Sequence, residues 1–271
     1  MSEILNMLSY HFMQRALIVG VLVSLCAALL GVSLVLKRFS MIGDGLSHVG
    51  FGALAVASAL GLAPLAVAVP VVVAAAVFLL RLRKSSRVKG DAAIAIISSS
   101  ALSIGVITVS LTTGMNTEVS SYMFGSVLSL SRGDAVLSVV LSLAVLALFV
   151  LLYPRIFAVT FDEDFSRATG TNTELYNTLL AVLTAVTVVL GMRMMGALLI
   201  SSLIIFPALA AMRLCKSFKA VVITAGAISV ACFLAGLTGS YFLETPTGAS
   251  IVAADLIAFA AACAIGRVHR A

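Results

Sequence analysis

The sequence predicts an all-α polytopic membrane protein with eight or nine transmembrane helices and short interfacial or coupling helices. Hydrophobic residues make up 62% of the 271 residues and charged residues only 10%, whereas ordinary globular chains carry about 25% charged residues. The apolar residues gather into continuous runs of about 20, the length with which a helix crosses a bilayer, and lack the alternation of outer-membrane barrels. A single transmembrane domain over residues 1–271 is therefore expected.

The apolar runs give the position of each expected helix. A window of about 20 residues places spans at 16–36, 45–61, 63–80, 92–112, 134–153, 175–191, 195–213, 219–239 and 248–266. The second run is short and interrupted by glycines, so it is expected to be a broken or partial span. Residues 1–14 are too polar to span and are expected to lie along the interface.

The basic residues indicate the orientation and exclude nucleic acid as a partner. Although the net charge is +6, the lysines and arginines cluster at the ends of apolar runs, where orientation signals belong. With nine crossings, 14 of the 17 basic residues fall on one side, which the positive-inside rule makes cytosolic. The C-terminus is then expected to be cytosolic.

Two long connections interrupt this pattern. Residues 113–133 contain a half-apolar stretch too short to cross, and an extracytosolic interfacial or re-entrant helix is expected there. Residues 154–174 form the one sizeable cytosolic feature and carry an acidic cluster at 162–164. Negative charge at the start of a helix is favoured by the helix dipole, and Gly170 is a plausible stop. A cytosolic helix over 161–170 is therefore expected.

Missing motifs weaken an enzymatic function. The sequence contains no G-x-x-x-x-G-K-[ST] for ATP, no H-E-x-x-H and no G-x-S-x-G, the motifs of a P-loop, a zinc protease and a serine hydrolase. The four scattered cysteines show no C-x-x-C spacing and are interpreted as small buried apolar residues.

The stretch SMIGDGLSHVGFG (40–52) places an aspartate and a histidine at the head of an apolar run. Asp44 and His48 are four residues apart, one helical turn, and so share a face. Counted from Arg38 at about 1.5 Å per residue, His48 would lie some 15 Å beyond the cytosolic interface, where an ionisable residue is a functional candidate. A carboxylate and an imidazole can together bind zinc or manganese. The alternative is structural: Asp44 caps the helix and His48 bonds to a neighbouring carbonyl.

Asp255 is the other acid inside an apolar run. A carboxylate at that depth must be paired, protonated or in contact with water. It is either a third residue of the metal pathway or a structural partner of a hydroxyl or backbone group.

Six stretches of the sequence form a recognisable set: FMQRAL (12–17), LVLKRFSMIGDGLSHVGFGALA (34–55), KGDAAIAIISSSAL (89–102), YMFGSVLSLSRGD (122–134), FDEDFSRATG (161–170) and GALLISSLIIFPALAAMRL (196–214). In this order they resemble the permeases of bacterial ATP-binding-cassette importers for zinc and manganese. Together they extend over nearly the whole chain. GDGLSHVGFG is closer to the zinc branch than to the manganese branch of that family.

The resemblance implies a permease subunit rather than an enzyme, in a bacterial cytoplasmic (inner) membrane. It implies a homodimer that works with separate cytosolic ABC ATPases and an extracytosolic metal-binding protein, and that transports Zn²⁺ or, alternatively, Mn²⁺ without a tightly bound cofactor. Asp44 and His48 match the family's pathway residues, whereas Asp255 matches no known family position. The segment 161–170 would contact the ATPase through Phe161, Asp162, Asp164, Phe165 and Gly170.

Three other functions remain open at this stage. The first is a manganese or iron importer of the same family. The second is an iron-chelate or cobalamin permease of similar layout, which would not need an Asp/His pair. The third is a secondary metal carrier that is driven by an ion gradient without an ATPase.

Overall fold

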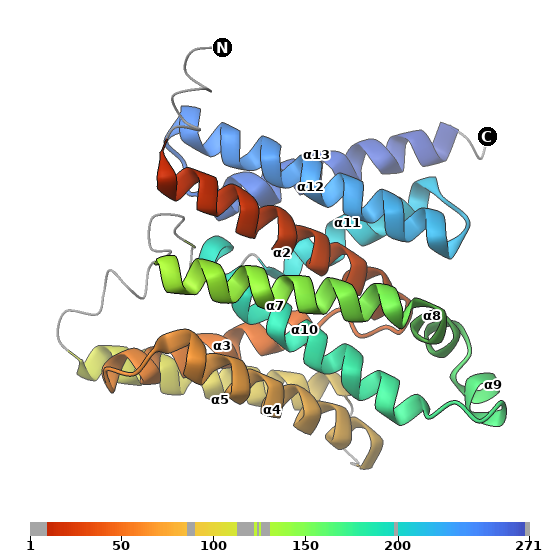
Figure 1. Ribbon diagram of the computed structural model, residues 1–271, viewed down its shortest axis with the longest axis horizontal. Helices are drawn as coiled ribbons and strands as arrows, with labels where there is room; N and C mark the ends of the chain where they lie inside the picture. The colour runs from red at the N-terminus through yellow and green to blue at the C-terminus, as the bar shows by residue number, and fades with distance from the viewer. Residues whose placement is uncertain are drawn as a thin grey trace.

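The computed structural model describes residues 10–85, 90–112, 122–123, 125, 131–197 and 200–268, and these residues form a helical bundle without β-strands (Figure 1). The all-α prediction is confirmed. The helices are α2 (His11–Leu36), α3 (Ile42–Ala59), α4 (Pro64–Ser85), α5 (Gly90–Leu111), α7 (Arg132–Leu151), α8 (Tyr153–Phe161), α9 (Glu163–Ala168), α10 (Thr173–Met195), α11 (Ile200–Leu214), α12 (Phe218–Leu243) and α13 (Thr247–Val268).

A helix lies at each of the nine predicted span positions, and within the described residues seven of those helices are long and apolar enough to cross a membrane. These are α2, α4, α5, α7, α10, α12 and α13. The other two fall short for different reasons: α11 has 15 residues, and α3 contains Asp44 and His48 within its 18 residues. Both lie against other helices. Protein rather than lipid therefore covers much of their surface, and a polar or short helix is tolerated there.

The first helix begins earlier than the sequence indicated. Residues 11–14 belong to α2, and Met13 is buried. The placement of residues 1–14 along the interface stays a prediction. Residues 1–9 lie outside the described part of the chain, as does most of the predicted interfacial helix within 113–133.

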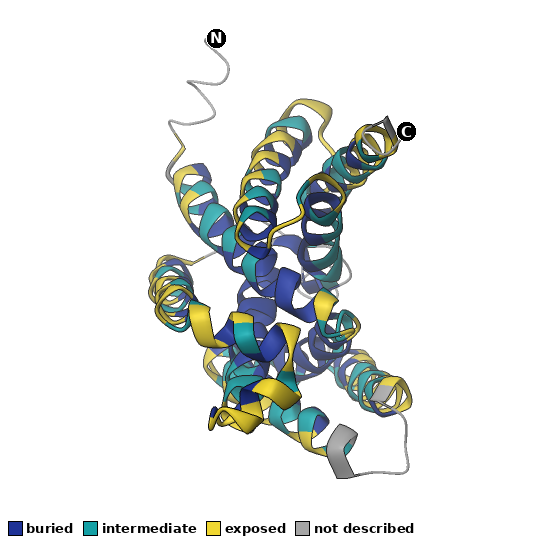
Figure 2. Ribbon diagram, turned by 90° about the vertical axis from the view of Figure 1, so that its right-hand side faces the viewer, coloured by how far each residue is buried: buried dark blue, intermediate teal, exposed yellow. Residues whose placement is uncertain are grey.

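Burial separates inner from outer helices. Most of α2, α3 and α10 is buried, and thirteen of the 18 residues of α3 are inaccessible. The outer helices α4, α5, α7 and α13 expose much of their apolar surface, as Figure 2 shows by the buried residues gathered at the centre of the bundle. Such outward apolar surface is what lipid contact requires.

The helix ends that carry most of the basic residues lie together. The ends of α2, α4, α7, α11 and α13 and the short helices α8 and α9 occupy the right-hand side of Figure 1. We call this side the basic end of the bundle, and the opposite side the far end. The start of α7 and the end of α10 lie at the far end.

Close packing between α3 and α5 depends on glycine. A Cβ atom on Gly52 would lie 2.6 Å from the carbonyl oxygen of Ala101, and one on Gly45 would lie 2.6 Å from the Ile94 side chain. Small residues let transmembrane helices approach to this separation. The glycines that interrupt the second apolar run therefore pack α3 tightly against α5, and the helix continues through them unbroken.

Candidate functional site

The candidate site lies on α3, which packs against α4, α5, α10 and α11. A turn at residues 37–41 separates α2 from α3, and Arg38 adopts a positive φ of 57° within it. The turn is closed by a backbone hydrogen bond from Phe39 to Leu34, 2.8 Å long. It reverses the chain at the basic end and directs the start of α3 into the bundle.

Asp44 and His48 are the residues of the first turns of α3 that remain accessible. The side chain of Asp44 is 38% exposed and that of His48 is 15% exposed, while Gly45, Leu46 and Ser47 between them are buried. The predicted shared face is therefore present, and it is the open face of an otherwise enclosed helix. A ligand that entered beside α3 would meet these two side chains.

The two groups are close without being bonded to each other. His48 Nε2 lies 3.9 Å from Asp44 Oδ2, beyond the usual limit for a hydrogen bond. His48 Nδ1 is buried and has no hydrogen-bond partner among the described residues. A buried nitrogen without a partner is uncommon. Nε2, the nitrogen that faces Asp44, is therefore the atom through which the imidazole could hold an ion.

The pair lies in the first two turns of α3. Because α3 begins at Ile42, His48 lies about 9 Å along the helix axis from its first residue. The estimate of 15 Å assumes a straight helix from Arg38, where the chain instead turns. The structural alternative for Asp44 is also wrong in part: the N-cap is Met41, with no side-chain hydrogen bond, so Asp44 lies within the first turn.

Asp255 is not brought together with the pair. It lies on α13, which packs on α11 and α12, and the described residues contain no group of three or more His, Cys, Asp and Glu side chains suited to a metal. Asp255 is 1% exposed, and neither carboxylate oxygen has a hydrogen-bond partner in the described residues. The Cys232 thiol lies beside it. All four cysteines are free, as expected, and Cys26 and Cys232 are buried.

A polar network at the far end, which the sequence did not suggest, fixes the other end of α3. The Ser58 and Tyr122 hydroxyls share a hydrogen bond of 3.1 Å. Arg193 lies over the Tyr122 ring, with Cζ 5.7 Å from its centroid, and forms an ion pair with Asp134. These residues come from four separate stretches of the chain, so no local spacing indicates their contact.

The segment 161–170 is helical in part and projects from the basic end (Figure 1). α8 ends at Phe161, Asp162 caps α9 by accepting a 2.8 Å hydrogen bond from the Phe165 N–H, and Gly170 follows the helix with φ of 84°. Phe161 and Phe165 are 61% and 65% exposed. A short helix is present within the predicted segment, over Glu163–Ala168, and the segment exposes one aromatic side chain from α8 and one from α9.

Fold and site together define a multi-pass helical membrane protein with an acid–imidazole pair on an inner helix. The chain belongs to the ABC 3 transport family, whose model matches residues 9–266. A "Probable iron transport system membrane protein" of Haemophilus influenzae is 31% identical over 98% of both chains. The "High-affinity zinc uptake system membrane protein ZnuB" of the same organism is 30% identical over 92% of this chain and 96% of the relative.

Solved structures have the same fold. A chain of "PsaBC from Streptococcus pneumoniae in complex with Fab" superposes with a TM-score of 0.87 at 28% identity and covers 96% of this chain and 94% of its own. "An inward-facing conformation of a putative metal-chelate type ABC transporter" gives 0.76 at 14% identity, over 96% and 88% of the two chains. The second likeness concerns the fold alone.

Proposed function

We propose that this chain is the permease subunit of an ATP-driven importer for divalent metal ions, with zinc as its main substrate. The observation that carries the proposal is the Asp44–His48 pair, which occupies the open face of the otherwise buried helix α3. The names of its relatives include zinc and iron transport and the "Manganese import system permease protein ScaB" of Streptococcus gordonii, 27% identical over 92% of this chain and 90% of the relative.

The chemistry of the pair favours zinc over the other ions. Imidazole nitrogen and carboxylate oxygen are common zinc ligands, and structural zinc sites have four of them. One chain supplies two, which leaves the ion weakly held and free to leave, as transport requires. In a homodimer a second Asp44–His48 pair would complete four ligands at the interface. Manganese, which accepts more carboxylate and water, is the alternative substrate.

The outer surface of α5 supports pairing with a second copy. Small residues at helical spacing are exposed along it: Ala92, Ala95, Ser99 and Ser103. Such stripes allow transmembrane helices to approach closely.

The ATPase would dock at the basic end, which we place in the cytosol together with the C-terminus. The basic residues favour that orientation by the positive-inside rule. Phe161, at the end of α8, and Phe165, on the short capped helix α9, are exposed, and exposed aromatic side chains are typical of binding surfaces. Asp162, Asp164 and Gly170 would shape this docking segment. An extracytosolic metal-binding protein would deliver the ion to the far end.

Uptake by the assembled complex tests the proposal. The chain is reconstituted in liposomes with its ATPase and binding protein, and uptake of radioactive zinc and of manganese is measured with and without ATP. We expect ATP-dependent zinc uptake that His48→Ala and Asp44→Asn reduce by at least about 100-fold, because losing a ligand should cost no less than losing an outer-shell partner, which costs about 10–100-fold. Glu244→Gln, which changes an exposed acid at the end of α12, is the matched control and should transport normally.

The same measurement separates the rival functions. Normal uptake by His48→Ala in correctly assembled complex would contradict the proposed pathway and favour a chelate substrate. Uptake by the chain alone under an ion gradient, without ATP or ATPase, would instead indicate a secondary carrier. Manganese uptake that exceeds zinc uptake, and that depends on the same pair, would retain the importer and change its substrate.

A further inference from the structure

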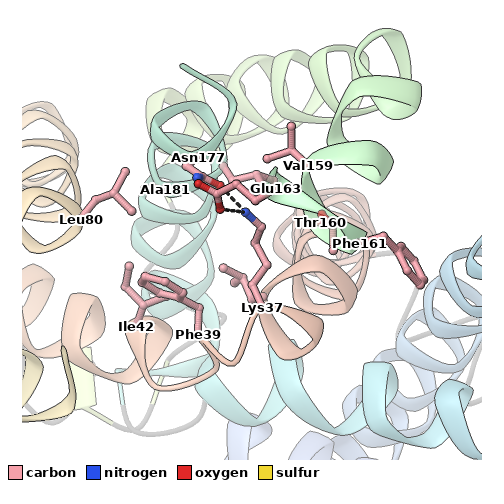
Figure 3. A pocket seen from close by; sticks show the side chains of 12 residues that line it. Lys37, Phe39, Ile42, Leu80, Val159, Thr160, Phe161, Glu163, Asn177 and Ala181 are labelled. Atoms are coloured by element: carbon pink, nitrogen blue, oxygen red, sulfur yellow. Dashed lines mark hydrogen bonds and ion pairs between the residues drawn. The ribbon is translucent and has the colours of Figure 1, made fainter. Parts of the chain in front are cut away.

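A cavity of about 390 Å³ lies at the basic end between the α2–α3 turn and α9 (Figure 3). Its walls come from α2, α3, α4, α8, α9 and α10, and most of the lining is apolar: Leu34, Phe39, Ile42, Leu80, Val159, Leu180 and Ala181. Hydrophobic contacts are non-directional. The apolar side chains that line the cavity therefore do not by themselves fix the position of α9 relative to α3.

Lys37 crosses this cavity. Its ammonium lies 3.3 Å from Glu163 Oε2 on α9 and donates a hydrogen bond to Asn177 Oδ1 on α10. Figure 3 shows its side chain extending from the turn toward both groups, opposite Phe39 and Ile42. One side chain thus joins the turn before α3, the exposed short helix and the start of α10. Charge-assisted hydrogen bonds of this kind have a defined geometry.

Glu163 is ionised at neutral pH. Burial would raise the pKa of its carboxyl group, but the Asn177 side chain and the charges of Lys37 and Arg167 outweigh burial, so the pKa lies below its usual value. The Lys37 side chain is only 14% exposed, which limits the screening that weakens ion pairs at an open surface. The contact is therefore a charged one under physiological conditions.

The same helix α10 is bonded to the other end of α3. At the far end, Ser58 of α3 bonds to Tyr122, whose ring lies under Arg193 in the last turn of α10. At the basic end, Asn177 of α10 holds Lys37, five residues before α3 begins. Polar contacts thus tie α3 to α10 at both ends. A displacement of α9 that pulls on Lys37 would act on both helices together.

We propose that Lys37 is a positioning residue that couples movement of α9 to α3 and so to the Asp44–His48 pair. This inference rests on the proposed function, because it assumes that α9 receives the work of the ATPase. Without Lys37, α9 would move over the apolar walls of the cavity while α3 stayed in place. ATP would then be hydrolysed without delivery of metal.

The test is the number of zinc ions taken up per ATP hydrolysed, measured in liposomes that contain the complete complex. Lys37→Met keeps the apolar stem and removes the charge, and Glu163→Gln removes the opposite charge. We expect each to lower this ratio by about ten-fold, within the usual range of coupling between sites, with zinc affinity retained. Arg38→Met, which changes the exposed neighbouring cation, is the matched control and should keep the wild-type ratio.

Exchanging the two charges distinguishes loss of the ion pair from misfolding of the variants. The double variant Lys37→Glu with Glu163→Lys restores an ion pair across the same cavity and should recover most of the ratio, while Lys37→Glu alone should not. A wild-type ratio of zinc to ATP in Lys37→Met would overturn the inference. So would a ratio in the double variant that is no higher than that of Lys37→Glu alone. If the wild-type complex takes up neither zinc nor manganese, the proposed function itself is wrong. If the wild type transports metal and the Lys37 variants do so with the same ratio, only the role of Lys37 is wrong.

Discussion

Arg193, in the last turn of α10, forms an ion pair with Asp134, in the first turn of α7. The Arg193 side chain is 9% exposed and that of Asp134 is 20% exposed. Tyr122 covers the guanidinium and connects it to Ser58. The far end of the bundle is therefore held by a largely enclosed charge pair that joins α7, α10 and α3.

Removing one partner of this pair should destabilise the protein strongly. Asp134→Asn leaves the arginine charge enclosed and uncompensated, which costs about 3–5 kcal/mol in buried pairs. We expect a lower unfolding midpoint in detergent. Arg132→Met changes an exposed cation in the same helical turn and should leave the midpoint within a degree or two of wild type, on the order of surface substitutions. Equal midpoints for Asp134→Asn and wild type would mean that the pair contributes nothing.

The ion pair of Lys37 and Glu163 should make part of the stability depend on pH. The pKa of Glu163 is lower in the folded protein than its ordinary value of 4.5. Its contribution is therefore complete above that value and is lost as the pH falls through the folded pKa. We expect Glu163→Gln to unfold more easily than wild type at pH 7, and the difference to shrink at pH values below 4.5. Thermal unfolding of both proteins across this range measures it, and a difference that grows toward acid pH would contradict the assignment.

The contact of α3 with α5 should tolerate no side chain at Gly52. A Cβ atom there would lie 2.6 Å from the Ala101 carbonyl oxygen, which belongs to the backbone and cannot rotate away. Gly52→Ala should therefore separate the two helices and cost about 1–3 kcal/mol, as overpacking does. Gly239→Ala, in a helix with no atom within 4 Å of the added Cβ, should be neutral or stabilising. If both substitutions lower the unfolding midpoint equally, the cost is not one of helix separation.

The sequence predicts features that arise from nearby residues. Apolar runs give the helix positions, and the four-residue spacing gives the common face of Asp44 and His48. The acidic first turn of α9 and its end before Gly170 follow from short-range preferences of the same kind, whereas the cap at Asp162 appears only in the structure. The break between the spans 16–36 and 45–61 follows from the apolar runs, but no proline or glycine marks the turn at Arg38, so the start of α3 at Ile42 does not follow from the sequence.

Contacts between distant residues could not be predicted in this way. Lys37 and Glu163 are 126 residues apart, and Asp134 and Arg193 are 59 apart. Each of these residues is individually typical of a helix end, and their pairing depends on which helices pack together. A single sequence carries no periodic signal for such packing. The network that holds α3 at both ends therefore emerges only from the fold.

Substitution of Asp255 tests whether this buried acid contacts the transported ion. Its carboxylate is buried among α11, α12 and α13 with no hydrogen-bond partner in the described residues, an arrangement that costs about 1–3 kcal/mol for a polar group. Asp255→Val should therefore be neutral or stabilising, as a higher unfolding midpoint would show. Because the structure does not bring Asp255 to the Asp44–His48 pair, zinc uptake should persist in Asp255→Val and in the isosteric Asp255→Asn. Loss of uptake in both variants, with intact assembly, would instead place this carboxylate in the ion pathway. That outcome would require α13 to approach the ion at another stage of transport.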